Sequence, residues 1–157
     1  MARANDVASY LVSLRNSDEN SGKYFSLSNL KMQKILYFCQ GVYHAMHDTS
    51  LIDDHSFEAW PYGPVIPQVY SRFSKFGQTD ISDREAKSYN LTQDQIFVIN
   101  KVWNLLKNKE AFDLVDATHL PGSPWDTIYN DENRFDSVIP NNLIRNYFLN
   151  IGAGVVR

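Results

Sequence analysis

The sequence predicts a mainly α-helical domain of the α+β class, packed around a central helix and carrying a small two-stranded β-ribbon. Apolar residues recur at helical spacing over most of the chain, and one long segment is apolar around much of its circumference. The chain has 157 residues, 43% of them hydrophobic and 13% aromatic, which suffices for one sizeable core. We therefore expect a single domain spanning residues 1–157.

The N-terminal part contains the first two predicted helices. Asn5 can cap the first helix, which we expect to end near Asn16 because the following residues are polar. The second begins after Ser26 or Ser28 and runs to about His47. Its apolar positions cover so much of the helix surface that we expect it to be central in the core. They are Met32, Ile35, Leu36, Cys39, Val42, Tyr43 and Met46.

Short extended segments follow the second helix. Residues 50–52 and 57–60 are expected to pair as the two strands of the ribbon. Three prolines within residues 61–67 then predict a rigid, irregular link, because proline removes amide donors and restricts the residue before it. Pro67 can open the next helix, and Gly77 can close it.

Helical spacing continues to the C-terminus. It predicts helices at about 93–107, 110–119 and 140–150, with a short helix that begins at Pro124. We find no internal repeat in the sequence, so we expect these helices to pack in the same domain as the first two.

Charge, hydropathy and cysteine usage disfavour several classes of protein. The formal net charge of −3 argues against nucleic-acid binding, which needs a basic excess to neutralise phosphates. The longest apolar run, residues 35–39, is far shorter than the roughly 20 residues that cross a bilayer, so we expect no membrane partner. The lone cysteine, Cys39, cannot form an internal disulfide, and we expect a cytoplasmic protein.

Histidines near the end of the second helix are the candidate metal ligands. His44 and His47 are three residues apart and could share a metal with Asp48, Asp54 or His55. Cationic side chains are also favoured at helix C-termini by the helix dipole, and no established metal-binding motif is present. We expect no metal and no other cofactor.

Catalytic patterns are equally weak. His119 could form an acid–base set with Asp116 and Glu58 only if the fold brought them together. Cys39 lies on the apolar stripe of the second helix, where a thiol is expected to be inert. We expect no enzyme activity and keep a small metal-dependent enzyme as the alternative class.

Three stretches of the chain resemble the Panacea domain family. Residues 30–41 resemble its helix motif Lys-x-x-Lys-Leu-Leu-Tyr-x-x-x-Gly, and residues 57–70 resemble Glu-Ala-Trp-x-x-Gly-Pro-Val-x-x-x-Val-Tyr. Residues 118–125 match a Thr-His…Pro-Trp element. The resemblance covers about residues 6–130. The motif positions are Lys34, Tyr37, Gly41, Glu58, Trp60, Gly63, Pro64, Tyr70, His119 and Trp125.

The resemblance implies an antitoxin of a toxin–antitoxin pair. Members of the family, which include SocA-like and phage-associated GepA-like proteins, sit beside unrelated toxins and neutralise them by direct protein–protein binding. The SocA-like branch also acts as an adaptor that delivers the toxin to a protease. The expected partner is a toxin encoded nearby, with a protease or chaperone as a further partner. Exposed aromatic residues on a small domain would also suit a homodimer.

Two surfaces are candidates for binding the partner. Tyr62 lies at the apex of the proline-rich turn, and Arg72 and Lys75 are three apart on the helix that follows, so these two share a face. The second candidate is acidic and includes Asp113 and Asp116. The alternatives are that Tyr62 packs inward and that the acidic residues serve solubility.

The acidic surface belongs to a segment with an uneven charge. Residues 110–136 contain seven carboxylates and one basic residue, Arg134, a balance of −6. We also expect a buried aromatic scaffold in which Glu58, a carboxylate within the ribbon, needs a partner such as His119 or Lys34. The aromatic residues of this scaffold are Trp60, Tyr70 and Trp125.

Overall fold

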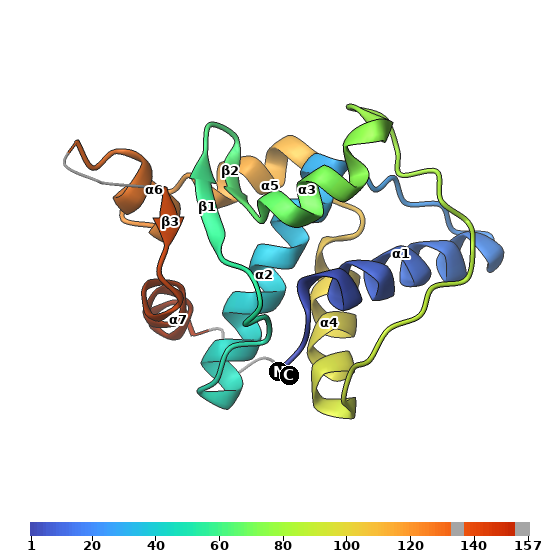
Figure 1. The fold of residues 1–157 in the computed structure, drawn as a ribbon, viewed down its shortest axis with the longest axis horizontal. Helices are drawn as coiled ribbons and strands as arrows, with labels where there is room; N and C mark the ends of the chain where they lie inside the picture. The colour runs from blue at the N-terminus through green and yellow to red at the C-terminus, as the bar shows by residue number, and fades with distance from the viewer. Residues whose placement is uncertain (133–136, 153–157) are drawn as a thin grey trace.

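Helices dominate the structure, a computed structural model that describes residues 1–132 and 137–152 (Figure 1). A small antiparallel sheet completes it, so the predicted mainly α-helical class is confirmed. The elements are α1 (Ala4–Asn20), α2 (Asn29–His47), β1 (Phe57–Trp60), β2 (Gly63–Val65), α3 (Pro67–Phe73), the 3₁₀ helix η1 (Ser74–Phe76), α4 (Gln93–Leu106), α5 (Ala111–Thr118), α6 (Pro124–Tyr129), β3 (Val138–Ile139) and α7 (Asn141–Asn150).

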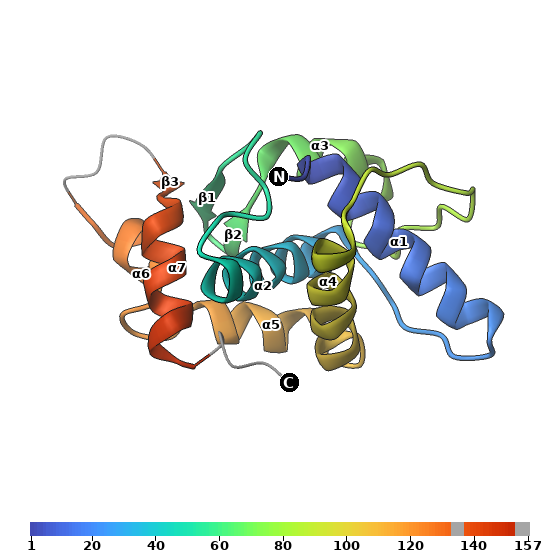
Figure 2. The same cartoon turned by 90° about the horizontal axis from the view of Figure 1, so that it is seen from below.

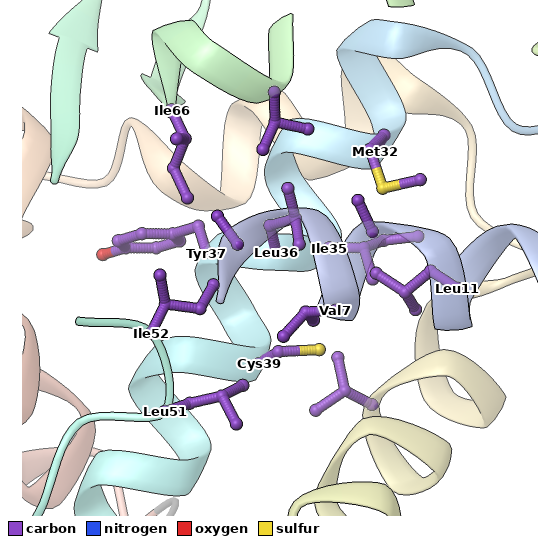
Figure 3. Close-up of a cluster of buried hydrophobic side chains, with 14 of the residues drawn as sticks. Val7, Leu11, Met32, Ile35, Leu36, Tyr37, Cys39, Leu51, Ile52 and Ile66 are labelled. Carbon is purple, nitrogen blue, oxygen red and sulfur yellow. The ribbon is translucent and has the colours of Figure 1, made fainter. Parts of the chain in front are cut away.

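Helix α2 is central, as predicted. Figures 1 and 2 show it between α7 on one side and α4 on the other, and it packs against α1, α3, α5 and β2 as well. Ser28 caps its N-terminus by accepting a hydrogen bond from the Lys31 amide at 3.2 Å. Its side chains fill the middle of the core, where Leu36 and Cys39 are fully buried beside Val7 of α1 (Figure 3).

The sheet has three strands in the order β2-β1-β3, and it does not contain the predicted pairing of residues 50–52 with β1. The physical reason is that the Gln40 side chain of α2 hydrogen-bonds to both the amide and the carbonyl of Ile52. The Gln40 side chain accepts from the Ile52 amide at 2.8 Å and donates to the Ile52 carbonyl at 3.0 Å. Ile52 is therefore anchored to the helix and forms only an isolated bridge with Ala2.

The partner of β1 is β2, within the stretch predicted to be an irregular link. Trp60 pairs with Gly63, so Pro61 and Tyr62 form the turn of a β-hairpin. Gly63 has a φ of +110°, which disfavours any residue with a side chain. A Cβ built on Gly63 would also lie 2.8 Å from the Lys34 Cε atom, so the hairpin packs directly on α2.

Helix α1 is longer than predicted at both ends. It begins at Ala4 with Arg3 at the N-cap position, so Asn5 lies inside the helix and does not cap it. It continues past Asn16 to Asn20 because other elements hold its polar end. The Asp18 carboxylate, for example, accepts a hydrogen bond from Trp103 of α4 at 2.9 Å.

The later helices begin and end within one residue of their predicted bounds. Pro67 is the first residue of α3, and Gly77 closes η1 with a φ of +58°. None of the helices in the described part of the chain is long and apolar enough to cross a membrane.

Candidate binding groove

An apolar groove lies between the β1–β2 hairpin, the start of α2, the end of η1 and the start of α5. Its volume is about 360 Å³, and its lining includes no charged residue. Four aromatic rings line it: Trp60 and Tyr62 from the hairpin, Phe112 from α5, and Tyr70 from the neighbouring helix α3. We take this groove as the candidate functional site, because the sequence places Tyr62 at the apex of the hairpin that forms one wall.

The rings are arranged as two edge-to-face pairs. The ring centroids of Trp60 and Tyr70 are 5.3 Å apart, and those of Tyr62 and Phe112 are 5.9 Å apart. Tyr62 and Phe112 are each 60% exposed, so a hairpin and a helix distant in sequence jointly present apolar surface to solvent. Exposed apolar clusters of this kind mark interaction sites.

Trp60 and Tyr70 line the groove, so the prediction that both are buried is wrong. Side chains alternate between the two faces of a strand, and in β1 the core face belongs to Phe57 and Ala59, at 1% and 3% exposure. Trp60 therefore points to the opposite face and is half-buried. The prediction is confirmed for Trp125, which is only 6% exposed.

Glu58 holds the Trp60 indole in place. Its carboxylate accepts hydrogen bonds from the Trp60 Nε1 atom at 3.1 Å and from the Ser137 hydroxyl at 3.2 Å. Its predicted pairing with His119 or Lys34 is therefore wrong. The Trp60 carbonyl in turn accepts a hydrogen bond from the Trp125 Nε1 atom at 2.6 Å. Both the side chain and the backbone of Trp60 are therefore held by hydrogen bonds.

His119 is a packed aromatic ring. It stacks on Trp125 with a centroid distance of 3.6 Å and an interplanar angle of 5°. Burial, and then the nearby Lys34 charge, lower its pKa below the ordinary value, so the ring is neutral at pH 7. Asp116, which the sequence suggested as an acid–base partner of His119, is exposed on α5. The structure does not assemble this set with Glu58.

Lys34 supports the hairpin from beneath. Its side chain is fully buried, and its Nζ atom donates to the Pro64 carbonyl at 2.9 Å. Burial lowers its pKa to about 7, because the charged ammonium loses its hydration. The resemblance motif therefore places a buried amine under β2, where Gly63 leaves room for its stem.

Replacing Lys34 with Met is expected to reduce the pH dependence of stability. Between pH 7 and 8.5 the folded parent loses the Lys34 proton while the unfolded chain keeps it, so the parent free energy of unfolding rises. The rise is at most about 1.4 kcal/mol per pH unit. Urea unfolding at both pH values measures it, with exposed Lys75→Met as the control. Equal rises in parent and Lys34→Met would contradict the prediction. Above this range the unfolded chain also loses the Cys39 proton while burial keeps the folded thiol protonated, which opposes the rise.

Tyr37 and Gly41, the other motif residues of α2, pack against α7. Tyr37 meets the ring of Phe148 edge-to-face at 5.5 Å, and burial raises the pKa of its hydroxyl. A Cβ built on Gly41 would lie 2.2 Å from the Phe148 ring, so only glycine allows α7 this close. These two residues hold the core together and lie outside the groove lining.

Arg72 and Lys75 do not line the groove. Arg72 is half-buried, donates to the Asn5 carbonyl at 3.1 Å and lies over the Phe73 ring, so it ties α3 to α1. Lys75 is exposed in η1, beside the groove end formed by Gly77. They remain candidates for the rim of a larger contact.

Asp113 and Asp116 are exposed on α5, immediately after the groove-lining Phe112. Sequence reasoning missed Phe112, although Phe112 directly precedes Asp113 on an amphipathic helix whose core face holds Leu114 and Val115, which indicates an exposed ring. Among the residues that the structure describes, no group of three or more His, Cys, Asp or Glu side chains could hold a metal ion, and His44 and His47 belong to none.

A mainly helical domain whose exposed aromatic rings gather in an uncharged groove has the features of a protein-binding module. This chain belongs to the SocA-like antitoxin family. The family profile described as "Antitoxin SocA-like, Panacea domain" matches residues 32–126, from α2 into α6. The chain is also 36% identical over 115 residues to Antitoxin SocA of Caulobacter vibrioides (strain NA1000 / CB15N). That alignment covers 66% of this chain and 61% of the relative, so the chain spans about three fifths of its length. No solved structure matches the chain.

Proposed function

We propose that this protein is an antitoxin that neutralises a toxin by binding it directly, with the aromatic groove as the centre of the contact. The observation that carries the proposal is the cluster of Trp60, Tyr62, Tyr70 and Phe112 around an uncharged hollow. Tryptophan and tyrosine are among the residues that most often dominate binding energy. Membership of an antitoxin family supports the toxin as partner and a non-enzymatic role.

The size of the groove indicates what part of a toxin it could hold. At about 360 Å³ it lies at the small end of the range for ligand pockets, so it would take a few side chains and not a whole element. A stable protein–protein contact buries about 800 Å² on each partner. The remaining contact would therefore extend over the rim, where Asp113, Asp116 and Lys75 are exposed.

The hairpin wall of the groove is held before any partner arrives. Lys34 bonds the Pro64 carbonyl, Trp125 bonds the Trp60 carbonyl, and Glu58 bonds the Trp60 indole. Groups that are already ordered lose little conformational entropy on binding. This supports direct capture of a toxin by a preformed surface.

Co-expression with the toxic product of a neighbouring gene tests the proposal. Both genes are placed under unrelated inducible promoters, so that any rescue of growth cannot come from control of the native promoter. We expect rescue together with a complex that co-purifies at equal stoichiometry. Rescue without a complex would contradict direct binding. Rescue that disappears in a host lacking its ATP-dependent protease would assign delivery to the protease as the step after binding.

A further inference from the structure

We infer that the groove takes a basic segment of the partner, with an arginine or lysine stem between the aromatic rings and its charge toward the carboxylates of α5. This inference rests on the proposed function and deepens it by naming the chemistry of the bound segment. Its two supports are the absence of a cation over the groove rings within the described residues and the charge along one rim.

None of the four groove rings has a lysine or arginine of the described chain over it, whereas four other rings do. Four rings elsewhere carry a lysine or arginine within about 5.5 Å of the centroid, a distance at which the cation is attracted to the ring face. The pairs elsewhere are Arg72 with Phe73 at 4.7 Å, Lys107 with Phe25 at 4.8 Å, Lys75 with Phe76 at 5.3 Å and Lys101 with Phe97 at 5.4 Å.

The rim on the α5 side is acidic. Asp116 is four residues after Phe112, so the two share a face of the helix, and Asp113 directly follows Phe112. Both carboxylates are exposed, and the structure places neither in an ion pair within residues 1–132 and 137–152. A cation emerging from the groove would therefore meet an unpaired negative charge.

The cations of this chain that lie near the groove are already engaged. Lys31 follows the lining residue Leu30, but its Nζ atom donates to the Lys107 carbonyl at 2.6 Å, and Lys75 lies over the Phe76 ring. The Lys31 charge interacts with the Glu110 carboxylate at the start of α5, but neither lysine forms an ion pair with Asp113 or Asp116 within the described residues. Complementarity of charge therefore favours a basic occupant over an acidic one, and it would speed association at low salt.

Three short probes test the inference without the toxin. The ¹⁵N-labelled full chain is titrated with acetyl-Ala-Arg-Leu-Arg-Ala-amide and with analogues carrying Gln or Glu in place of both Arg residues. The Trp60 indole N–H and the Phe112 amide report on the groove. We expect the Arg probe to shift both signals, to bind about tenfold more tightly than the Gln probe, and to lose this advantage at high salt.

A matched pair of double variants assigns the preference to the rim. Asp113→Asn with Asp116→Asn is expected to reduce the advantage of the Arg probe to about twofold or less. Asp53→Asn with Glu85→Gln removes the same charge from exposed positions elsewhere and is expected to preserve it. An equal loss in both variants would show a general charge effect and would overturn the assignment.

The outcomes separate this inference from the proposed function. Equal binding of the Arg and Gln probes would show an apolar occupant, and tighter binding of the Glu probe an acidic one; either overturns the inference. The absence of groove shifts with all three probes also overturns it. Direct toxin binding is judged by the co-purified complex, which forms or fails independently of these titrations.

Discussion

Arg15→Ala is expected to destabilise the protein by about 3–5 kcal/mol, a large part of the 5–15 kcal/mol typical of a domain. The Arg15 side chain is fully buried, and its guanidinium donates to the Asp80 carboxylate at 2.8 Å and to the Ile81 carbonyl. The same Asp80 oxygen accepts from the Leu27 amide at 2.7 Å. Truncation would therefore remove the buried cation from a largely buried carboxylate and take one donor from the Ile81 carbonyl, in the loop that connects η1 to α4.

Two variants act as controls in a urea-unfolding comparison. Arg84 also reaches Asp80, at 3.6 Å, but its side chain is 39% exposed, so Arg84→Ala is expected to cost about 1 kcal/mol or less. Arg15→Lys keeps the charge but loses the several planar N–H donors of the guanidinium. Its loss of stability should therefore lie between the losses of Arg15→Ala and Arg84→Ala. Similar losses for Arg15→Ala and Arg84→Ala would show that the buried network contributes little.

Tyr62→Ala with Phe112→Ala is expected to weaken toxin binding by about 30-fold or more, corresponding to about 2 kcal/mol. The two rings contact each other across the mouth of the groove, and each is 60% exposed. Their removal takes away apolar surface that only a bound partner would cover. Calorimetric titration with purified toxin measures the change, and the melting temperature should stay close to that of the parent.

Leu105→Ala is the matched control for this prediction. Leu105 is 61% exposed on α4 and does not line the groove, so Leu105→Ala removes exposed apolar surface at another place. We expect its affinity for the toxin to equal that of the parent. Parent-like affinity in the Tyr62 and Phe112 variant, combined with a loss in Leu105→Ala, would move the interface to α4.

Helices could be predicted from this sequence because their signal is local. The apolar positions of α2, its Ser28 cap and the proline that opens α3 are all visible within a few residues. The sheet could not be predicted in the same way. Residues 50–52 have the composition of a strand, but the Gln40 side chain hydrogen-bonds to the backbone of Ile52. This contact joins a helix to a later segment, so no local pattern indicates it.

Only the hairpin side of the candidate site could be predicted, because the α5 side depends on contacts between segments distant in the sequence. Tyr62 could be placed at the apex of a rigid turn, and strict alternation in β1 would also have placed Trp60 opposite the core. Phe112 lies 50 residues after Tyr62, and nothing local indicates that α5 packs beside the hairpin. The groove exists because β2 and α5 both pack against α2, which is a property of the folded chain.

Hydrogen exchange of the purified antitoxin–toxin complex tests whether the aromatic groove is the surface that binds the toxin. We expect slower exchange on binding in the segments that form the groove, residues 28–30, 61–65, 77–78 and 111–113, with little change on the outer face of α4. Unchanged exchange in all four groove segments, with protection confined to α4 or α7, would contradict it.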